Sequence, residues 1–221
     1  MSRRSVAFAG IAIAALAGSA YTFGGWAVTT VEDLPEYLTV GQPVDIAFKV
    51  RQHGGPPTTG LKPVLIANDG RSEVRVAAMP KESGTYHASL AVPRAGDWTI
   101  TINTEFKPTD ITLRPIPAIA AGATPPRARS AAERGERLFI AKGCATCHAH
   151  LAVDGSGWLK VGPDLTPKRY QADYLAKYLN DPSIARPPGV RNTMPTLELK
   201  PTEIAALTAF LNDERQVSTK E

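Results

Sequence analysis

The chain has 221 residues, enough for one large domain or two small domains with buried cores. Its formal net charge of +4 arises from the first 25 residues and from residues 117–130, whereas residues 26–116 and 131–213 are close to neutral. Because no basic surface is concentrated in the sequence, nucleic-acid binding is not expected.

The N-terminus has the pattern of an export signal. A positively charged start, MSRR, precedes an apolar run over residues 6–20, and small residues near its end suit cleavage after Ala17 or Ala20. We expect a signal peptide over residues 1–20; the alternative is an uncleaved membrane anchor that continues to about Val28. Both interpretations place the remaining chain in the periplasm or another extracytoplasmic compartment, in the second case tethered to the membrane.

Residues 26–116 alternate between apolar and polar side chains, which is the period of strands with one buried face. In VDIAFKV, for example, every second residue from Val44 to Val50 is apolar. About seven such segments, separated by turns, predict an all-β, immunoglobulin-like sandwich. The stretch SGTYHASLAVPRAGDWTITI resembles the FixH-like or YtkA-like β-sandwich domains of exported bacterial proteins.

A change of composition separates this region from the rest of the chain. Residues 117–130 are rich in proline, alanine and glycine, and we expect them to form an extended linker. An all-α domain is expected over residues 131–213, followed by a short tail over residues 214–221. Because neither domain shows an apolar surplus that needs the other to cover it, we expect the two to fold independently.

The period is helical after the linker. Ser130 and Glu133 form an S-x-x-E capping box at the start of a first predicted helix. A second helix is expected near residues 171–180, and a third is expected to begin at Pro201. Because Lys200 occupies the N-cap position of this third helix, its cap should be weak.

The segment KGCATCHAH, residues 142–150, holds both cysteines and two of the four histidines of the chain. A thioredoxin-like thiol pair belongs to a βαβ unit, whereas the residues before Cys144 have a helical pattern. A structural zinc site needs four ligands, which adjacent Cys147 and His148 could hardly supply from one short segment. In C-x-x-C-H, two thiols form thioethers with haem and the histidine binds its iron, and the pentapeptide favours this chemistry.

Residues 131–213 resemble the class I, single-haem cytochromes c. The motifs that carry the resemblance are a first helix with a glycine and an aromatic residue, CATCH, GPDL at residues 162–165, a helix ending in NDP, TMP at residues 193–195, and a closing amphipathic helix. The resemblance implies an all-α cytochrome c fold with one haem c, covalently attached through Cys144 and Cys147, and its iron.

The same resemblance implies the ligands of the iron. His148 would be the proximal ligand, and the carbonyl of Pro163 would accept a hydrogen bond from its other ring nitrogen. Met194, 46 residues downstream of His148, would be the distal ligand. Met79 also precedes a proline, but it ends a predicted strand and is expected to be structural or exposed.

The other three histidines are also potential metal ligands. His150 follows the proximal ligand too closely to reach the opposite haem face, and we expect it at the surface. His53 and His87 lie at polar positions of predicted strands and, with Met79, raise copper binding as an alternative. Nothing in the sequence brings these three side chains together.

These features predict an extracytoplasmic carrier of single electrons rather than an enzyme, either alone or as a subunit of a larger oxidoreductase. Iron bound by both histidine and methionine has no open position for a substrate. The expected partners are a redox protein that donates electrons and one that accepts them, and a membrane respiratory or other electron-transport complex is a candidate for either. The sandwich would be a docking or spacer module. The alternatives are a copper-handling protein with the haem as accessory reductant, and a haem sensor or peroxidase with a displaceable methionine ligand.

Overall fold

The computed structural model describes residues 25–106, 109–166, 169–185 and 194–213. The expected signal peptide over residues 1–20 and the expected tail over residues 214–221 lie outside these ranges. The alternative end of an anchor, at about Val28, falls inside the first β-strand. Among the described residues, no helix is both long and apolar enough to cross a membrane.

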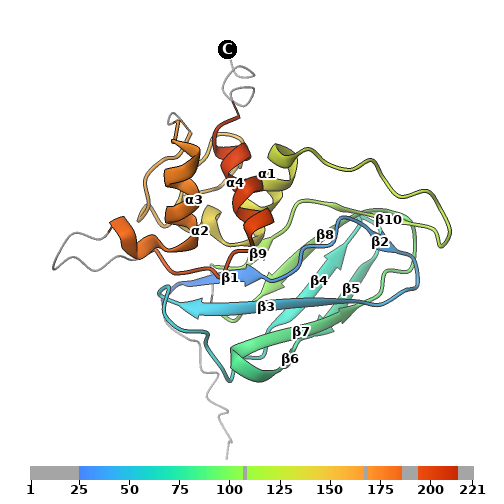
Figure 1. Cartoon of the computed structure of the whole chain (residues 1–221). Coiled ribbons are helices and arrows are strands. Elements are labelled where there is room, and N and C mark those ends of the chain that lie inside the picture. Colours follow the sequence, from blue (N-terminus) through green and yellow to red (C-terminus); the bar gives the residue numbers. More distant parts are fainter. Residues whose placement is uncertain (1–24, 107–108, 167–168, 186–193, 214–221) are drawn as a thin grey trace, which may run out of the picture.

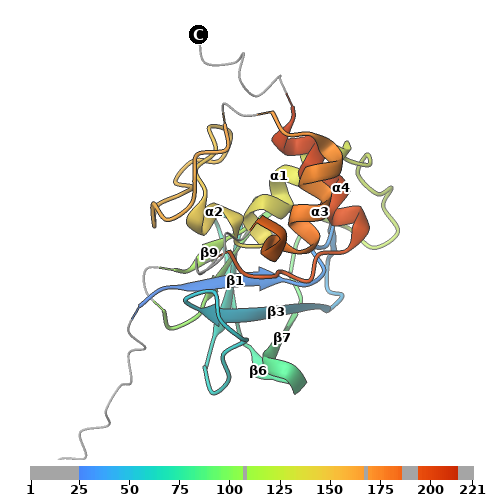
Figure 2. The same cartoon turned by 60° about the vertical axis from the view of Figure 1, so that its left-hand side comes forward.

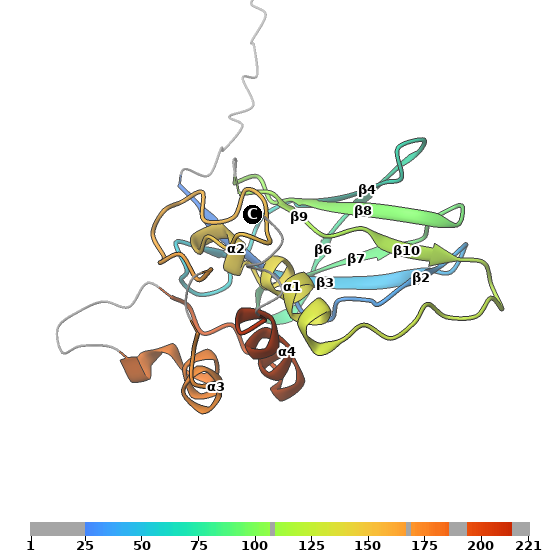
Figure 3. The same ribbon diagram turned by 90° about the horizontal axis from the view of Figure 1, so that it is seen from above.

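The N-terminal region is formed by two packed β-sheets, together called the sandwich domain (Figures 1 and 3). Its strands are β1 (Ala27–Val31), β2 (Leu38–Thr39), β3 (Val44–Gln52), β4 (Val64–Asn68), β5 (Glu73–Ala77), β6 (Met79–Pro80), β7 (Thr85–Leu90), β8 (Gly96–Asn103), β9 (Ile111–Thr112) and β10 (Ile116–Ile119). One sheet has the order β1-β3-β7-β6, and the other has the order β2-β10-β8-β4-β5 with β9 beside β8. Strands β10 and β2 are parallel, and the other pairs are antiparallel.

The core between the sheets contains the apolar side chains that alternate along the strands. In β3, Ile46, Phe48 and Val50 are fully buried. Because successive side chains of a strand point to opposite faces, the residues between them face away from this core. Tyr86 of β7 and Trp98 of β8 fill the centre of the sandwich. The prediction of an all-β N-terminal region is confirmed.

Strand β10 corrects the predicted end of the sandwich domain. It extends to Ile119, three residues into the expected linker, residues 117–130. Its residues Ile116 and Ala118 are buried and pair with β8. The proline-rich composition of the segment concealed this alternation, which is the pattern of a strand with one buried face. The chain that follows is exposed over residues 121–128.

The C-terminal region is helical, as predicted, and contains α1 (Ala131–Ala141), α2 (Cys144–Cys147), α3 (Ala172–Asn180) and α4 (Pro201–Leu211). Short 3-10 segments lie at η1 (Glu82–Gly84) in the sandwich domain and η2 (Pro182–Ala185) after α3. Helices α1 and α4 cross at Gly135, where a Cβ atom would lie 2.0 Å from the carbonyl oxygen of Ala206. Only glycine permits this close crossing.

The starts of α1 and α4 differ in their capping. Ser130 accepts from the backbone N–H of Glu133 at 3.2 Å, and the Glu133 carboxylate accepts from the N–H of Ser130 at 2.7 Å. The predicted capping box is therefore present. At α4 the Glu203 carboxylate accepts from the N–H of Lys200 at 2.9 Å. This is half of a capping box, because an ammonium group has no acceptor to offer in return.

The two domains share a buried interface along β1. The expectation that neither domain has an apolar surface for the other to cover is therefore wrong. Figures 1 and 2 show the helices gathered beside β1, which is an edge strand of its sheet. All five residues of β1 are buried. Ala27 and Val31 belong to the sandwich core, whereas Val28 lies outside that cluster and contacts the helical domain. The helical domain thus covers an edge that would otherwise be open.

A buried lysine crosses the same interface. Lys142, between α1 and α2, is 3% exposed. Its Nζ forms an ion pair with Glu203 of α4 at 2.7 Å and donates to the backbone oxygen of Glu32 at 2.8 Å. Because a buried ammonium group is costly without partners, the position of Lys142 depends on both domains.

Candidate functional site

The five residues singled out from the sequence line one pocket, called here the motif pocket. Its lining residues are Val28, Gly143, Cys144, Cys147, His148, Val161, Gly162, Pro163, Tyr178, Met194, Pro195 and Leu197. The empty space within it, part of which is open to solvent, is about 680 Å³.

A glycine in the left-handed region positions the two cysteines. Gly143 has φ +74°, and a Cβ atom there would lie 2.5 Å from Cγ1 of Val28 and 2.7 Å from the backbone oxygen of Thr29. The chain therefore leaves α1, turns tightly against β1 and begins α2. Cys144 and Cys147 are three residues apart in this helical turn, a spacing that places both thiols on one side of it.

His148 follows α2 with an extended backbone and is held by the segment around Pro163. Its Nδ1 lies 3.1 Å from the carbonyl oxygen of Pro163. When Nδ1 donates this hydrogen bond, the lone pair of Nε2 stays available to a metal. A Cβ atom on Gly162 would lie 2.6 Å from Nδ1 of His148, so this close approach also requires glycine. Burial lowers the pKa of His148, although the bond to Pro163 opposes this shift.

The environment of the thiols differs from that of a redox-active pair. Burial raises the pKa of the Cys144 thiol to about 12, and burial also raises the pKa of Cys147. Thiol-disulfide oxidoreductases activate a cysteine by lowering its pKa. The site therefore lacks the electrostatics of the thioredoxin-like alternative, while two neutral thiols beside a largely apolar pocket suit a bound haem.

Met194 enters the same pocket from the segment before α4. It packs against the core of the helical domain, and Pro195 and Leu197 of the same segment also line the pocket. Residues 186–193, which precede Met194, lie outside the described ranges. Met79 is 63% exposed in β6 and is not part of this pocket.

The comparison with protein families decides the nature of this region. Residues 132–214 match the model of the family described as Cytochrome c. The C-terminal region is a cytochrome c domain. Its cofactor is a covalently bound haem c with iron. The residues fit this group, because two thiols, an imidazole and a thioether line a single pocket with several apolar side chains.

Three solved structures that are similar to part of this chain have identities of 20% or less. They include a putative glycoside hydrolase from Bacteroides vulgatus (15% identity, 40% of this chain and 17% of that chain, TM-score 0.34). The Lin-41 filamin domain has 20% identity, covers 41% of this chain and 91% of that chain, and has a TM-score of 0.32. The Escherichia coli adhesin FdeC has 20% identity, covers 43% of this chain and 32% of that chain, and has a TM-score of 0.31. No curated protein matches the chain.

His150 is buried in the cytochrome c domain, and its predicted surface position is wrong. It is 6% exposed, with its ring 5.7 Å from the ring of Phe139 and 4.4 Å from that of Phe210. Its Nδ1 accepts a hydrogen bond from the N–H of Ala152 at 3.3 Å. The chain turns back after His148, so this side chain packs between α1 and α4. Burial lowers the pKa of His150, which favours a neutral ring in this aromatic core.

The two histidines of the sandwich domain have separate surroundings. His53 has φ +52° and packs its ring against Trp26 at 5.4 Å. Nδ1 of His87 lies 2.6 Å from the Asp45 carboxylate, and Met79 is its register partner on β6. Within the part of the chain that the structure describes, no group of three His, Cys, Asp or Glu side chains could hold a metal ion. The copper alternative therefore gains no support.

The residues of the pocket wall that were not predicted from the sequence include Val28, Tyr178 and Leu197. Tyr178 and Leu197 were visible only as apolar residues of the helical half. Val28 belongs to a different domain. The pattern AVTTV does not show which face of strand β1 points into the sandwich core and which points outward. For Val28 the sequence contains no signal, because its burial depends on the contact between domains.

Proposed function

We propose that this protein carries single electrons in an extracytoplasmic compartment, with His148 and Met194 as the axial ligands of its haem iron. The observation that carries the proposal is the presence of both side chains in the one pocket that also contains Cys144 and Cys147. The hydrogen bond between His148 and Pro163 supports the assignment, because it orients the ring and leaves Nε2 free to bind iron.

The haem would supply the one-electron chemistry, and the residues of the chain would hold it and set its environment. Cys144 and Cys147 would anchor it through thioethers. The soft thioether of Met194 would favour ferrous iron and so raise the reduction potential. Leu197, Val28 and other apolar residues of the pocket wall would exclude water, which acts in the same direction.

A carrier role follows from the coordination. An iron with ligands on both faces has no open position for peroxide, oxygen or another substrate. The partners would be a redox donor and a redox acceptor, among them a membrane respiratory complex or another subunit of a larger oxidoreductase. Export would precede haem attachment, and residues 1–24, which hold most of the segment that would direct export or form a membrane tether, lie outside the described residues.

For the sandwich domain we propose a docking role toward these partners rather than a spacer role. A spacer would separate the haem from another surface without contacting the haem pocket. Here the sandwich domain contributes Val28 to the motif pocket and an acceptor, the backbone oxygen of Glu32, to the buried Lys142. A domain fixed beside the cofactor in this way changes the surface that an approaching partner meets.

Covalent attachment and ligation can be tested on the full chain matured in a host that attaches haem c. The intact mass should equal that of the processed polypeptide plus one haem, and acidified organic solvent should extract no haem. The oxidised protein should show the methionine-to-iron charge-transfer band. A mass without haem would contradict the cofactor assignment, and absence of the band would favour the sensor or peroxidase alternative.

A further inference from the structure

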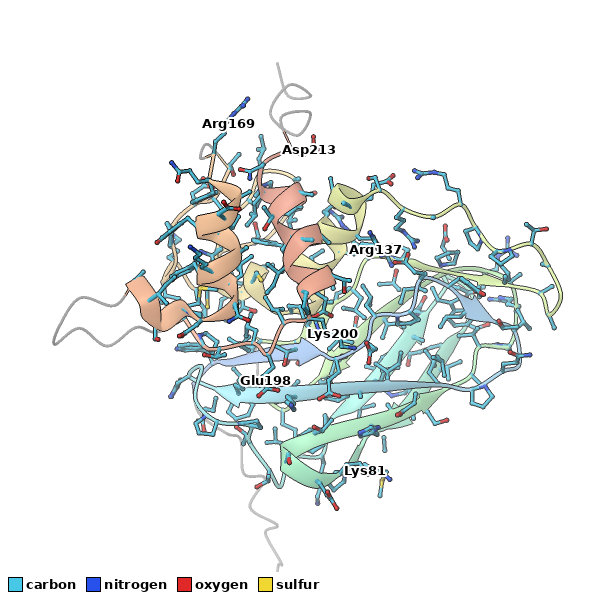
Figure 4. All side chains as sticks on the ribbon, in the orientation of Figure 1. Lys81, Arg137, Arg169, Glu198, Lys200 and Asp213 are labelled. Carbon is cyan, nitrogen blue, oxygen red and sulfur yellow. The ribbon has the colours of Figure 1, made fainter. Side chains whose placement is uncertain are left out.

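Glu198 connects the segment that carries Met194 to the sandwich domain. It lies four residues after Met194 and three residues before α4, and Figure 4 labels it beside strands β1 and β3. Its Oε2 is 2.6 Å from Nζ of Lys49, and its Oε1 is 3.4 Å from Nη2 of Arg51. Both cations belong to β3 of the sandwich domain. The carboxylate therefore joins the two domains.

The cationic side of this contact is buried at Arg51 and partly buried at Lys49. The side chain of Arg51 is 4% exposed and that of Lys49 is 15% exposed. Arg51 also donates from Nη1 to the hydroxyl oxygen of Thr30 at 2.7 Å, which fixes the guanidinium against β1. Glu32 of the sandwich domain also pairs with Lys49, at 3.3 Å from its Nζ, but it supplies one carboxylate beside two cations. Because a buried cation needs a partner of opposite charge, the sandwich domain still presents a preformed site for the Glu198 carboxylate.

The backbone of Glu198 is strained. Its φ is +55°, in the left-handed region that a glutamate seldom adopts. Such a conformation persists only where the surroundings hold it. The Lys49 and Arg51 contacts supply this restraint on one side, and burial of Leu197 and Leu199 supplies it on both flanks. The hydrogen bond from Lys49 lowers the pKa of Glu198, so the carboxylate is ionised at neutral pH.

The restraint lies close to the motif pocket. Met194, Pro195 and Leu197 all line that pocket, so a fixed Glu198 limits where this short segment can place the Met194 thioether. Four residues of extended chain span at most about 14 Å, so Met194 cannot lie farther than this from the restrained Glu198. A second ion pair between the domains lies two residues further along the chain, where the ammonium group of Lys200 pairs with Asp33 of the sandwich domain.

We propose that Glu198 is a positioning residue through which the sandwich domain, by Lys49 and Arg51, holds the Met194 segment in its iron-binding arrangement. The sandwich domain then acts on the haem itself, by stabilising the six-coordinate state, in addition to any role in docking. This inference rests on the proposed function, because it needs Met194 to be the distal ligand.

The test uses the full-length haem-loaded protein and the variants Glu198→Gln, Lys49→Gln, their combination, and Lys49→Arg. The matched control is Glu36→Gln, which breaks the ion pair between Arg129 and Glu36, away from the motif pocket. The measurements are carbon monoxide affinity of the reduced protein, the methionine-to-iron band of the oxidised protein, and the reduction potential. Circular dichroism checks that each variant is folded.

Glu198→Gln should increase the apparent carbon monoxide affinity by about two- to thirtyfold, the range expected when a coupling contact is lost. The band should weaken and the potential should fall. Lys49→Gln should change the carbon monoxide affinity, the band and the potential in the same direction by a smaller amount, and Lys49→Arg should resemble the wild type. The effects of Glu198→Gln and Lys49→Gln should be less than additive when the two are combined. Glu36→Gln should leave all three unchanged.

Two results would overturn the inference. One is a folded Glu198→Gln variant with the affinity, band and potential of the wild type. The other is an equal effect of Glu36→Gln, which would indicate a general loss of stability. If Glu198→Gln does not fold, Lys49→Gln decides by the same three measurements. A wild-type protein without the methionine-to-iron band would instead contradict the assignment of Met194, so that failure is distinguishable from failure of the Glu198 contact.

Discussion

Val28 of strand β1 and His148 of the CATCH motif line the same pocket, although 120 residues separate them in the sequence. Val28 points out of the sandwich core and packs against Gly143, the residue that precedes the first cysteine. The wall of the haem site is therefore built from both domains. Several properties of the haem should depend on residues of the sandwich domain for this reason.

The first prediction concerns polarity at Val28. Val28→Thr keeps the shape of the side chain and adds a hydroxyl group to the pocket wall. A more polar wall favours the ferric iron with its additional positive charge, so the reduction potential should fall. The control is Val31→Thr, which places the same group in the sandwich core, because Val31 is fully buried there. Equal potentials for both variants, measured by spectroelectrochemical titration, would contradict a role of Val28 at the haem.

The second prediction concerns Gly143. Gly143→Ala adds a Cβ atom at φ +74° and at 2.5 Å from Cγ1 of Val28. The left-handed conformation costs about 1–2 kcal/mol and the steric overlap about 1–3 kcal/mol more. Gly41→Ala isolates the first cost, because Gly41 has φ +73° and a Cβ atom there would meet nothing within 4 Å. Denaturant unfolding should show the larger loss of stability for Gly143→Ala, and equal losses would argue against a tight interface at β1.

The third prediction tests the distal ligand. Met194→Ala should keep the haem attached, because Cys144 and Cys147 are unchanged, but it should lower the potential and allow carbon monoxide to bind. Met79→Ala should do neither, since Met79 is 63% exposed in the sandwich domain. Spectra of the oxidised and reduced proteins provide the measurement. Retention of the wild-type spectrum by Met194→Ala would show that another group occupies the distal face.

The fourth prediction concerns the isolated cytochrome c domain. A fragment that begins at Ser130 keeps its capping box and all ligands, but it loses Val28, Glu32 and the cations that bind Glu198. Lys142 would lose the carbonyl acceptor supplied by Glu32 and would become exposed to water. We expect a lower unfolding midpoint and a lower potential than in the full chain. Identical values for fragment and full chain would show that the interface along β1 has no energetic effect.

Much of the site was predictable because it depends on residues that are close in sequence. The CATCH spacing, the GPDL and TMP motifs and the capping box at Ser130 each act over a few residues, and the alternation along the strands directly reflects one buried face. These local patterns were sufficient to predict an all-β domain followed by a haem-binding helical domain. They were also sufficient to single out Cys144, Cys147 and His148.

Tertiary structure decided the features that depend on how distant segments meet. The period of a strand shows that alternate residues face apart, but it does not show which outer face another domain will cover, so Val28 could not be identified. The burial of His150 could not be predicted, because its aromatic neighbours Phe139 and Phe210 come from two separate helices. The contact between Glu198 and Lys49 joins residues 149 positions apart. Such pairings depend on the packing of the two domains, which local sequence patterns do not encode.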